Sequence, residues 1–176
     1  MIIVIDVYYH ENEANAAAVV IKDWESEEII KIETLRVKTR SPYISGEFYK
    51  RELPCILQVL DLFKQEEIDI VVIDGYVVLD DTGKIGLGGY LYKSLGESIP
   101  VIGVAKRAFV NNSKNQVKVK RGKSEKPLFV TSLGIDLNES AERIKNMKGA
   151  YRIPDILKLV DQNSRIKEDD ILDDLS

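Results

Sequence analysis

The sequence predicts an α/β domain with a mixed central sheet, in which three antiparallel strands precede parallel ones, flanked by helices. Residues 2–9, 16–22 and 28–38 are rich in β-branched and aromatic side chains or alternate apolar with polar ones, as in an antiparallel meander. Two later segments, 68–74 and 99–105, are continuously apolar, which is typical of strands buried on both faces. Between the meander and these segments, apolar residues recur at helical spacing, which adds a helix to the sheet.

The length of 176 residues, with 44% hydrophobic and 31% charged residues, is ordinary for one globular domain, and no linker or repeat divides the chain. We expect a single domain over residues 1–176, with an acidic and flexible tail from about residue 166. No apolar stretch approaches the roughly 20 residues needed to span a bilayer, and the N-terminal apolar run lacks the flanks of a signal peptide. We therefore expect a cytoplasmic protein without membrane contact, acting as a monomer.

The helix after the meander is expected to run from about Gly46 to Glu66, where apolar residues recur with helical periodicity. Pro54 lies within this segment, so it either kinks the helix or lies near its true start. A glycine-rich loop after the first buried strand leads into a short helix, LGGYLYKSLG, that is expected to end at Gly96. The two buried strands are thus joined by a helical connection.

The last third of the chain is expected to form a hairpin and two helices. The hairpin, VKVKRGKSEKPLFVT, turns around Arg121–Lys126 with basic side chains on its tip and outer face. One helix is expected near Asn138–Met147 with Asn138 as its N-cap, and the other after Pro154. Three antiparallel strands, a helix, a buried strand, a helix and a further buried strand follow the element order of the ribonuclease H-like fold.

Two aspartates are candidates for a site at one end of the sheet. Asp6 lies in the middle of the apolar first strand, where a charge is costly without a partner, and Asp74 ends a buried strand just before a glycine. Each residue taken alone has a simpler interpretation. Asp6 could lie on a solvated face of its strand, and Asp74 could belong to an ordinary Asp-Gly turn. In the predicted fold their strands are neighbours, and two carboxylates a few ångströms apart repel unless a cation lies between them.

A third acid is expected on the first helix, where Glu52 precedes apolar residues and can face the sheet, with Glu47 as a local competitor. The alternative for either residue is a solvated helix charge. Carboxylate oxygens without cysteine or histidine support favour Mg²⁺ or Mn²⁺ over zinc. Cys55 is the only cysteine, which excludes an internal disulfide and a multi-cysteine zinc site, and it is expected on the buried face of the helix.

The net charge of −4 argues against indiscriminate nucleic-acid binding through overall charge. Basic residues nevertheless gather in one short segment, which either binds a nucleic acid or is a solvated hairpin. They are Lys114, Lys118, Lys120, Arg121, Lys123 and Lys126.

Four ordered segments, VIDVYY, SPYISGEFYKRELPCIL, VVIDGYVV and SIPVIGVAKRAF, resemble motifs of the endonuclease V family, and the resemblance covers nearly the whole chain. It implies that Asp6, Glu52 rather than Glu47, and Asp74 are the catalytic metal ligands. Lys106 takes the place of the family's active-site lysine. The resemblance further implies a Mg²⁺-dependent endonuclease, with Mn²⁺ possible, that hydrolyses a phosphodiester near deaminated bases such as inosine in DNA or RNA, in DNA repair or RNA processing.

The resemblance also implies residues around the substrate. Pro42, Tyr43 and Gly46 match the family's wedge loop, in which the tyrosine ring could stack where a base is displaced. Gly75, beside the third acid, is implied to contact the substrate. Asp161 matches a position near the second metal, with a solvated helix aspartate as the equally open alternative.

The chain departs from the family where two histidines, a proline and part of a basic run are replaced, at Tyr76-Val77, Leu133-Gly134, Ser45 and Leu79-Asp80-Asp81. These positions surround the base pocket and the substrate strand, and not the acids. Metal-dependent hydrolysis is therefore expected to be retained. Two other hypotheses stay open: a diverged nucleic-acid-binding module with altered substrate or no catalysis, and a nuclease for another lesion, a flap or a mismatch.

Overall fold

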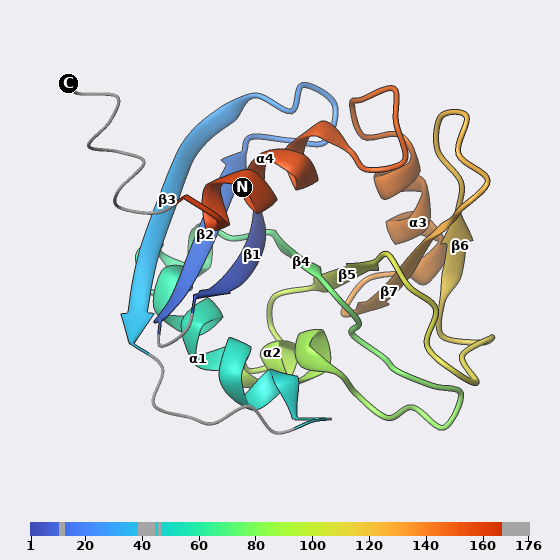
Figure 1. The fold of residues 1–176 in the computed structure, drawn as a ribbon, viewed down its shortest axis with the longest axis horizontal. Helices are drawn as coiled ribbons and strands as arrows, with labels where there is room; N and C mark the ends of the chain where they lie inside the picture. The colour runs from blue at the N-terminus through green and yellow to red at the C-terminus, as the bar shows by residue number, and fades with distance from the viewer. Residues whose placement is uncertain (11–12, 39–44, 46, 167–176) are drawn as a thin grey trace.

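A computed structural model describes residues 1–10, 13–38, 45 and 47–166 of the chain. Seven strands form one mixed sheet in the order β3-β2-β1-β4-β5-β7-β6 (Figure 1). The strands are β1 (Ile2–His10), β2 (Glu13–Ile21), β3 (Ile29–Lys38), β4 (Ile70–Asp74), β5 (Val101–Ala105), β6 (Val117–Val119) and β7 (Leu128–Leu133).

The pairing follows the order expected from the sequence. β1, β2 and β3 form the antiparallel meander, and β4 then pairs parallel to β1 and β5 parallel to β4. β2 starts earlier than predicted, because Glu13 pairs with His10 on one side and with Lys38 on the other. β2 thus begins before the apolar residues by which it was predicted.

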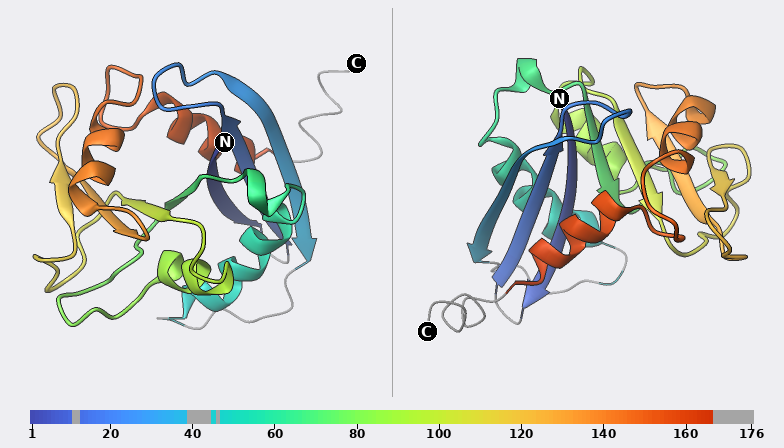
Figure 2. Two further views of the ribbon diagram at one scale, coloured as in Figure 1. Left: turned by 180° about the vertical axis from the view of Figure 1, so that it is seen from behind. Right: turned by 90° about the horizontal axis from the view of Figure 1, so that it is seen from above.

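Helices cover both faces of the sheet (Figure 2). They are α1 (Phe48–Leu60), α2 (Leu87–Ser94), α3 (Leu137–Lys145) and α4 (Asp155–Ser164), with a short 3₁₀ helix η1 (Gln65–Glu67) after α1. Alternate residues of β1 enter two apolar cores: Ile3 and Ile5 pack on the side of α1 and α2, and Ile2 and Val4 on the side of α3 and α4. No helix in these described ranges is both long and apolar enough to cross a membrane.

Two predicted helix boundaries were wrong. α1 ends at Leu60 and not near Glu66, because the apolar Phe63 packs against the core from an irregular turn and only imitates helical periodicity. α3 is capped by Asp136 and not by Asn138, since the Asp136 carboxylate accepts a 2.9 Å hydrogen bond from the Glu139 amide. Pro54 lies inside α1, and not near its start.

The hairpin of β6 and β7 is confirmed, but Arg121 is not part of its basic surface. The side chain is 5% exposed, and its guanidinium points inward to the loop between α3 and α4. It donates hydrogen bonds to five backbone carbonyls at the end of α3 and in this loop, those of Lys145, Met147, Gly149, Tyr151 and Arg152. Arg121 therefore orders the approach to α4, and of the basic residues in the segment only the lysines lie on its outer face.

Replacing Arg121 by methionine is expected to lower the free energy of unfolding by about 2–4 kcal/mol, because the carbonyls would lose a charged donor inside the protein. Chemical denaturation followed by circular dichroism measures the change. Lys123→Met is the matched control, since Lys123 is exposed on the same turn and its loss should change stability by less than about 0.5 kcal/mol. Equal stabilities of the two variants would contradict the buried role.

Candidate active site

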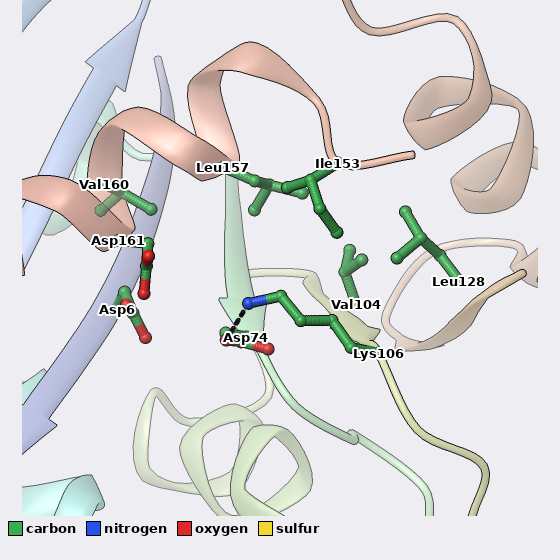
Figure 3. A pocket seen from close by; sticks show the side chains of 9 residues that line it. All are labelled: Asp6, Asp74, Val104, Lys106, Leu128, Ile153, Leu157, Val160 and Asp161. Carbon is green, nitrogen blue, oxygen red and sulfur yellow. Dashed lines mark hydrogen bonds and ion pairs between the residues drawn. The ribbon is translucent and has the colours of Figure 1, made fainter. Parts of the chain in front are cut away.

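Asp6 and Asp74 lie side by side on neighbouring parallel strands. β1 and β4 pair with Ile5 against Ile73, so the two aspartates occupy the next position on each strand. Adjacent strands lie about 4.8 Å apart, which brings the carboxylates into direct electrostatic contact. Each aspartate comes two residues after a valine, Val4 or Val72, that packs on the side of α3 and α4, so it lies on the same face of its strand. Figure 3 shows both aspartates below α4.

α4 brings a third acid to this place. Asp161 points from α4 toward Asp6 (Figure 3), and the Ser164 hydroxyl lies 3.0 Å from Asp6 Oδ2. Asn15, on β2, donates a 2.8 Å hydrogen bond to the Ser164 carbonyl and so holds the end of the helix against the sheet. Arg165 donates a 3.0 Å hydrogen bond to Asp161 Oδ1. Asp161 therefore belongs to the cluster and is not a freely solvated helix residue.

Ser164 and Asn15 were not identified from the sequence, although each carries a signal. Ser164 follows Asp161 by three residues and so lies on the same helical face. Asn15 precedes a run of alanines in a strand that is apolar apart from its first residue, Glu13, and it is 4% exposed. A buried amide in such a strand requires a hydrogen-bond partner, which here is the end of α4.

Glu52 reaches the same end of the sheet from α1, in the opposite helical layer. With Asp6 and Asp74 it lines a cleft of about 220 Å³. Ile56, one helical turn after Glu52, lines the same cleft. Glu47 is instead paired with Lys50, with 2.9 Å between the carboxylate and the ammonium. Of the two glutamates considered from the sequence, only Glu52 lines this cleft.

Burial and repulsion change the proton affinity of two of the acids. Burial, together with the charges of Asp74 and Asp161, raises the pKa of Asp6 to about 6, and the Ser164 hydrogen bond offsets part of this rise. Burial, with the charges of Asp6 and Asp74, raises the pKa of Glu52 to about 7. The acids therefore destabilise one another when ionised, which is the electrostatic setting that a bound cation relieves.

Lys106 follows β5 and lies at the edge of the cluster, with its Nζ 3.2 Å from Asp74 Oδ2. Its backbone carbonyl accepts a hydrogen bond from Arg152, whose guanidinium also bonds the carbonyls of Lys126 and Pro127. Arg152 therefore ties the end of β5, the start of β7 and the segment before α4 together beside the acids. Lys106 is an exposed lysine held at a defined place.

The acids suit a hard divalent cation by their chemistry, since all their donors are carboxylate oxygens. Among the described residues, no group of three or more acidic, histidine or cysteine side chains meets closely enough to form a ready metal site. Asp6 instead faces Asp161, Asp74 is paired with Lys106, and Glu52 lies across the cleft. Binding of Mg²⁺ or Mn²⁺ would require these carboxylates to turn toward one another, in competition with Lys106.

A second pocket, which we name the aromatic pocket, adjoins the acidic cleft. It has a volume of about 430 Å³, and Tyr49, Tyr76, Tyr90 and Phe109 line it. The Tyr49 and Tyr90 rings are stacked, with 3.8 Å between their centroids and 11° between their planes. Gly75 forms part of the wall with φ +136°, a backbone conformation that other residues rarely adopt. Glu52 and Asp74 line both the aromatic pocket and the cleft.

The aromatic pocket was not predicted from the sequence, because its rings come from α1, α2 and two loops that meet only in the fold. Gly75 was expected at the substrate and lies in the pocket wall. Pro42, Tyr43 and Gly46, the expected wedge loop, lie outside the described residues.

Both the sequence and the fold are similar to those of known proteins. The family model for Endonuclease V matches residues 1–162. Endonuclease V of Pyrococcus abyssi is 33% identical over 170 residues, which cover 94% of this chain and 80% of that protein. The fold is similar to that of Endonuclease V from Bacillus subtilis, with a TM-score of 0.77 and 20% identity over 98% of this chain and 81% of that one.

A further solved structure is that of Ciona intestinalis Endonuclease V in complex with DNA that contains an inosine followed by a ribo-adenosine. The TM-score is 0.75 and the identity 22%, with 99% of this chain and 87% of that chain covered. The structural likeness confirms the predicted ribonuclease H-like fold.

Proposed function

Because the chain belongs to the endonuclease V family, we propose that it is a Mg²⁺-dependent endonuclease that hydrolyses a phosphodiester bond near a deaminated base in DNA or RNA. The observation that carries the proposal is the convergence of Asp6, Glu52, Asp74 and Asp161 at one end of the sheet. Family membership makes the protein a nuclease. The ion, the deaminated base and a role in DNA repair or RNA processing are parts of the proposal.

Each group at the cleft has a chemical task in this proposal. Asp6, Glu52, Asp74 and Asp161 would hold Mg²⁺ or Mn²⁺, which supplies an oriented water and stabilises negative charge on the scissile phosphate. Lys106 adds a fixed positive charge at the same edge, where it stabilises the charge that develops on the phosphate oxygens. The Ser164 hydroxyl keeps Asp6 in place through its hydrogen bond.

The aromatic pocket supports a base-directed enzyme. A base displaced from its neighbours can stack on aromatic rings, which is worth about 1–3 kcal/mol per base. Because Glu52 and Asp74 line both the pocket and the cleft, a base in the pocket would leave its backbone phosphate close to the acids. The relative from Ciona intestinalis, whose complex contains an inosine, supports the choice of base.

Cleavage of end-labelled DNA and RNA strands with one central inosine tests the proposal. We expect nicking just 3′ of inosine with Mg²⁺ or Mn²⁺, none with EDTA, and at least about tenfold slower nicking of a strand with adenine at that position. Binding without cleavage at every divalent ion would contradict the nuclease proposal and support a binding module. Cleavage that does not depend on inosine but requires a flap or a mismatch would indicate a different substrate.

A further inference from the structure

The loop 107–116 supplies Phe109 to the aromatic pocket. Residues 112–114 of this loop are held by the loop that follows β4. The Asp81 carboxylate accepts 2.7 Å hydrogen bonds from the amides of Ser113 and Lys114, and Asn112 donates a 3.0 Å bond to the Val78 carbonyl. Asp81 therefore fixes the backbone of residues 113 and 114 in this loop.

Residues 107–109, at the start of this loop, are bound by the Tyr76 hydroxyl. The Tyr76 hydroxyl donates a 2.7 Å hydrogen bond to the Arg107 carbonyl and accepts a 3.0 Å bond from the Phe109 amide. The rings of Tyr76 and Phe109 are also in contact, with 5.9 Å between their centroids. Phe109 remains 44% exposed, so its ring is only partly packed against the rest of the protein.

The backbone around Tyr76 is itself rigidly placed. The Tyr76 carbonyl accepts a 3.0 Å hydrogen bond from the Gly88 amide, and the next amide, that of Val77, donates a 2.8 Å bond to the buried Thr131 hydroxyl. Gly103 packs so closely that an added Cβ would lie 2.5 Å from the Gly75 carbonyl oxygen. Tyr76 therefore transmits the position of the sheet end, where Asp74 lies, to Phe109.

We propose that Tyr76 is a positioning residue whose hydroxyl holds Phe109 as a wall of the aromatic pocket, and that this wall sets how well the pocket discriminates between bases. The motif resemblance implies that Tyr76 replaces a histidine of the family. The inference rests on the proposed function, because discrimination is measured on nucleic-acid strands. A displacement of about 1 Å in a group that positions a substrate can cost two orders of magnitude in rate.

Tyr76→Phe tests the proposal, since it removes the hydroxyl and keeps the ring. Hydrogen exchange of the Phe109 amide is expected to become about tenfold faster, while the Ser113 amide, bonded to Asp81, stays unchanged. The ratio of kcat/KM for inosine and adenine strands is expected to fall about tenfold, mainly through KM for the inosine strand. Tyr92→Phe is the matched control, because Tyr92 packs against Gly134 and not at the aromatic pocket.

A double variant separates positioning from general loosening. If Tyr76 acts through Phe109, Tyr76→Phe combined with Phe109→Ala should discriminate no worse than Phe109→Ala alone. Losses that multiply, or an unchanged ratio in Tyr76→Phe, would overturn the proposal. A wild-type protein that nicks neither strand would contradict the proposed nuclease function instead. Discrimination is then measured as the ratio of Kd values for the same two strands, and the same comparison of variants decides the role of Tyr76.

Discussion

Replacing Asp74 by asparagine is expected to slow strand cleavage by about a thousandfold or more while leaving the fold intact. The amide keeps the size of the side chain but removes the charge that faces Asp6, Glu52 and Lys106 at the end of β4. Stability should not fall, because the ion pair with Lys106 is partly exposed and such pairs contribute about 0–1 kcal/mol. Loss of the Asp74 charge also removes repulsion on Asp6 and Glu52. Single-turnover cleavage of the inosine strand with Mg²⁺, alongside thermal unfolding, measures both effects.

Asp61→Asn is the matched control, since Asp61 is an exposed aspartate at the C-cap of α1, away from the cleft. It should cleave at the rate of the wild type. Full activity of Asp74→Asn at saturating Mg²⁺ would remove Asp74 from the catalytic set.

Replacing Glu52 by glutamine is expected to abolish cleavage and yet to stabilise the metal-free protein by about 1–3 kcal/mol at pH 8. The reason is that burial and the charges of Asp6 and Asp74 raise the pKa of Glu52 from its ordinary value of 4.5 to about 7. Ionisation of Glu52 thus lowers the free energy of unfolding near neutral pH. For a domain of this size, each 1 kcal/mol corresponds to about 2–4 °C in Tm.

The pH window follows from the sign of the shift. Below about pH 4.5 Glu52 is protonated in both folded and unfolded chains, so the glutamine variant gains nothing. As the pH rises to about 7, the unfolded chain releases the proton first, and the stability of the wild type falls relative to the variant. Thermal unfolding in EDTA between pH 4 and 8 measures this, with the exposed Glu66→Gln as control. A variant no more stable than wild type at pH 8 would contradict the electrostatic account.

Much of the fold could be predicted because local patterns and strand pairing agree. The alternation in residues 28–38 and the apolar runs ending at Asp74 and Ala105 marked the strands, and the order of elements indicated which strands are neighbours. The meeting of Asp6 with Asp74 followed from that order alone. A polar residue at the end of a buried strand is a local signal that the sequence contains. The parallel register of β1 and β4 then brings the two aspartates together.

The remaining features depend on contacts between distant segments, which no local pattern reports. Arg121 appeared to be one more residue of a basic run, since only the loop between α3 and α4 shows what its guanidinium binds. The aromatic pocket combines rings from four segments, and Asp161 could not be told from a surface aspartate until α4 was placed over β1. Helix boundaries were misjudged at Phe63 because burial without helical structure leaves the same periodicity.

The hydrogen bonds of Asn15 and Arg152 also bear on the order in which a ribosome makes this protein. Asn15 is synthesised early, but its hydrogen bond to the Ser164 carbonyl can form only after α4 has been synthesised. The Lys106 carbonyl likewise has no Arg152 guanidinium to bond until residue 152 has been synthesised. A nascent chain can therefore pair its first strands well before the acidic cluster is complete. We expect the proposed nuclease activity to appear only after α4 has been synthesised and has packed against the sheet.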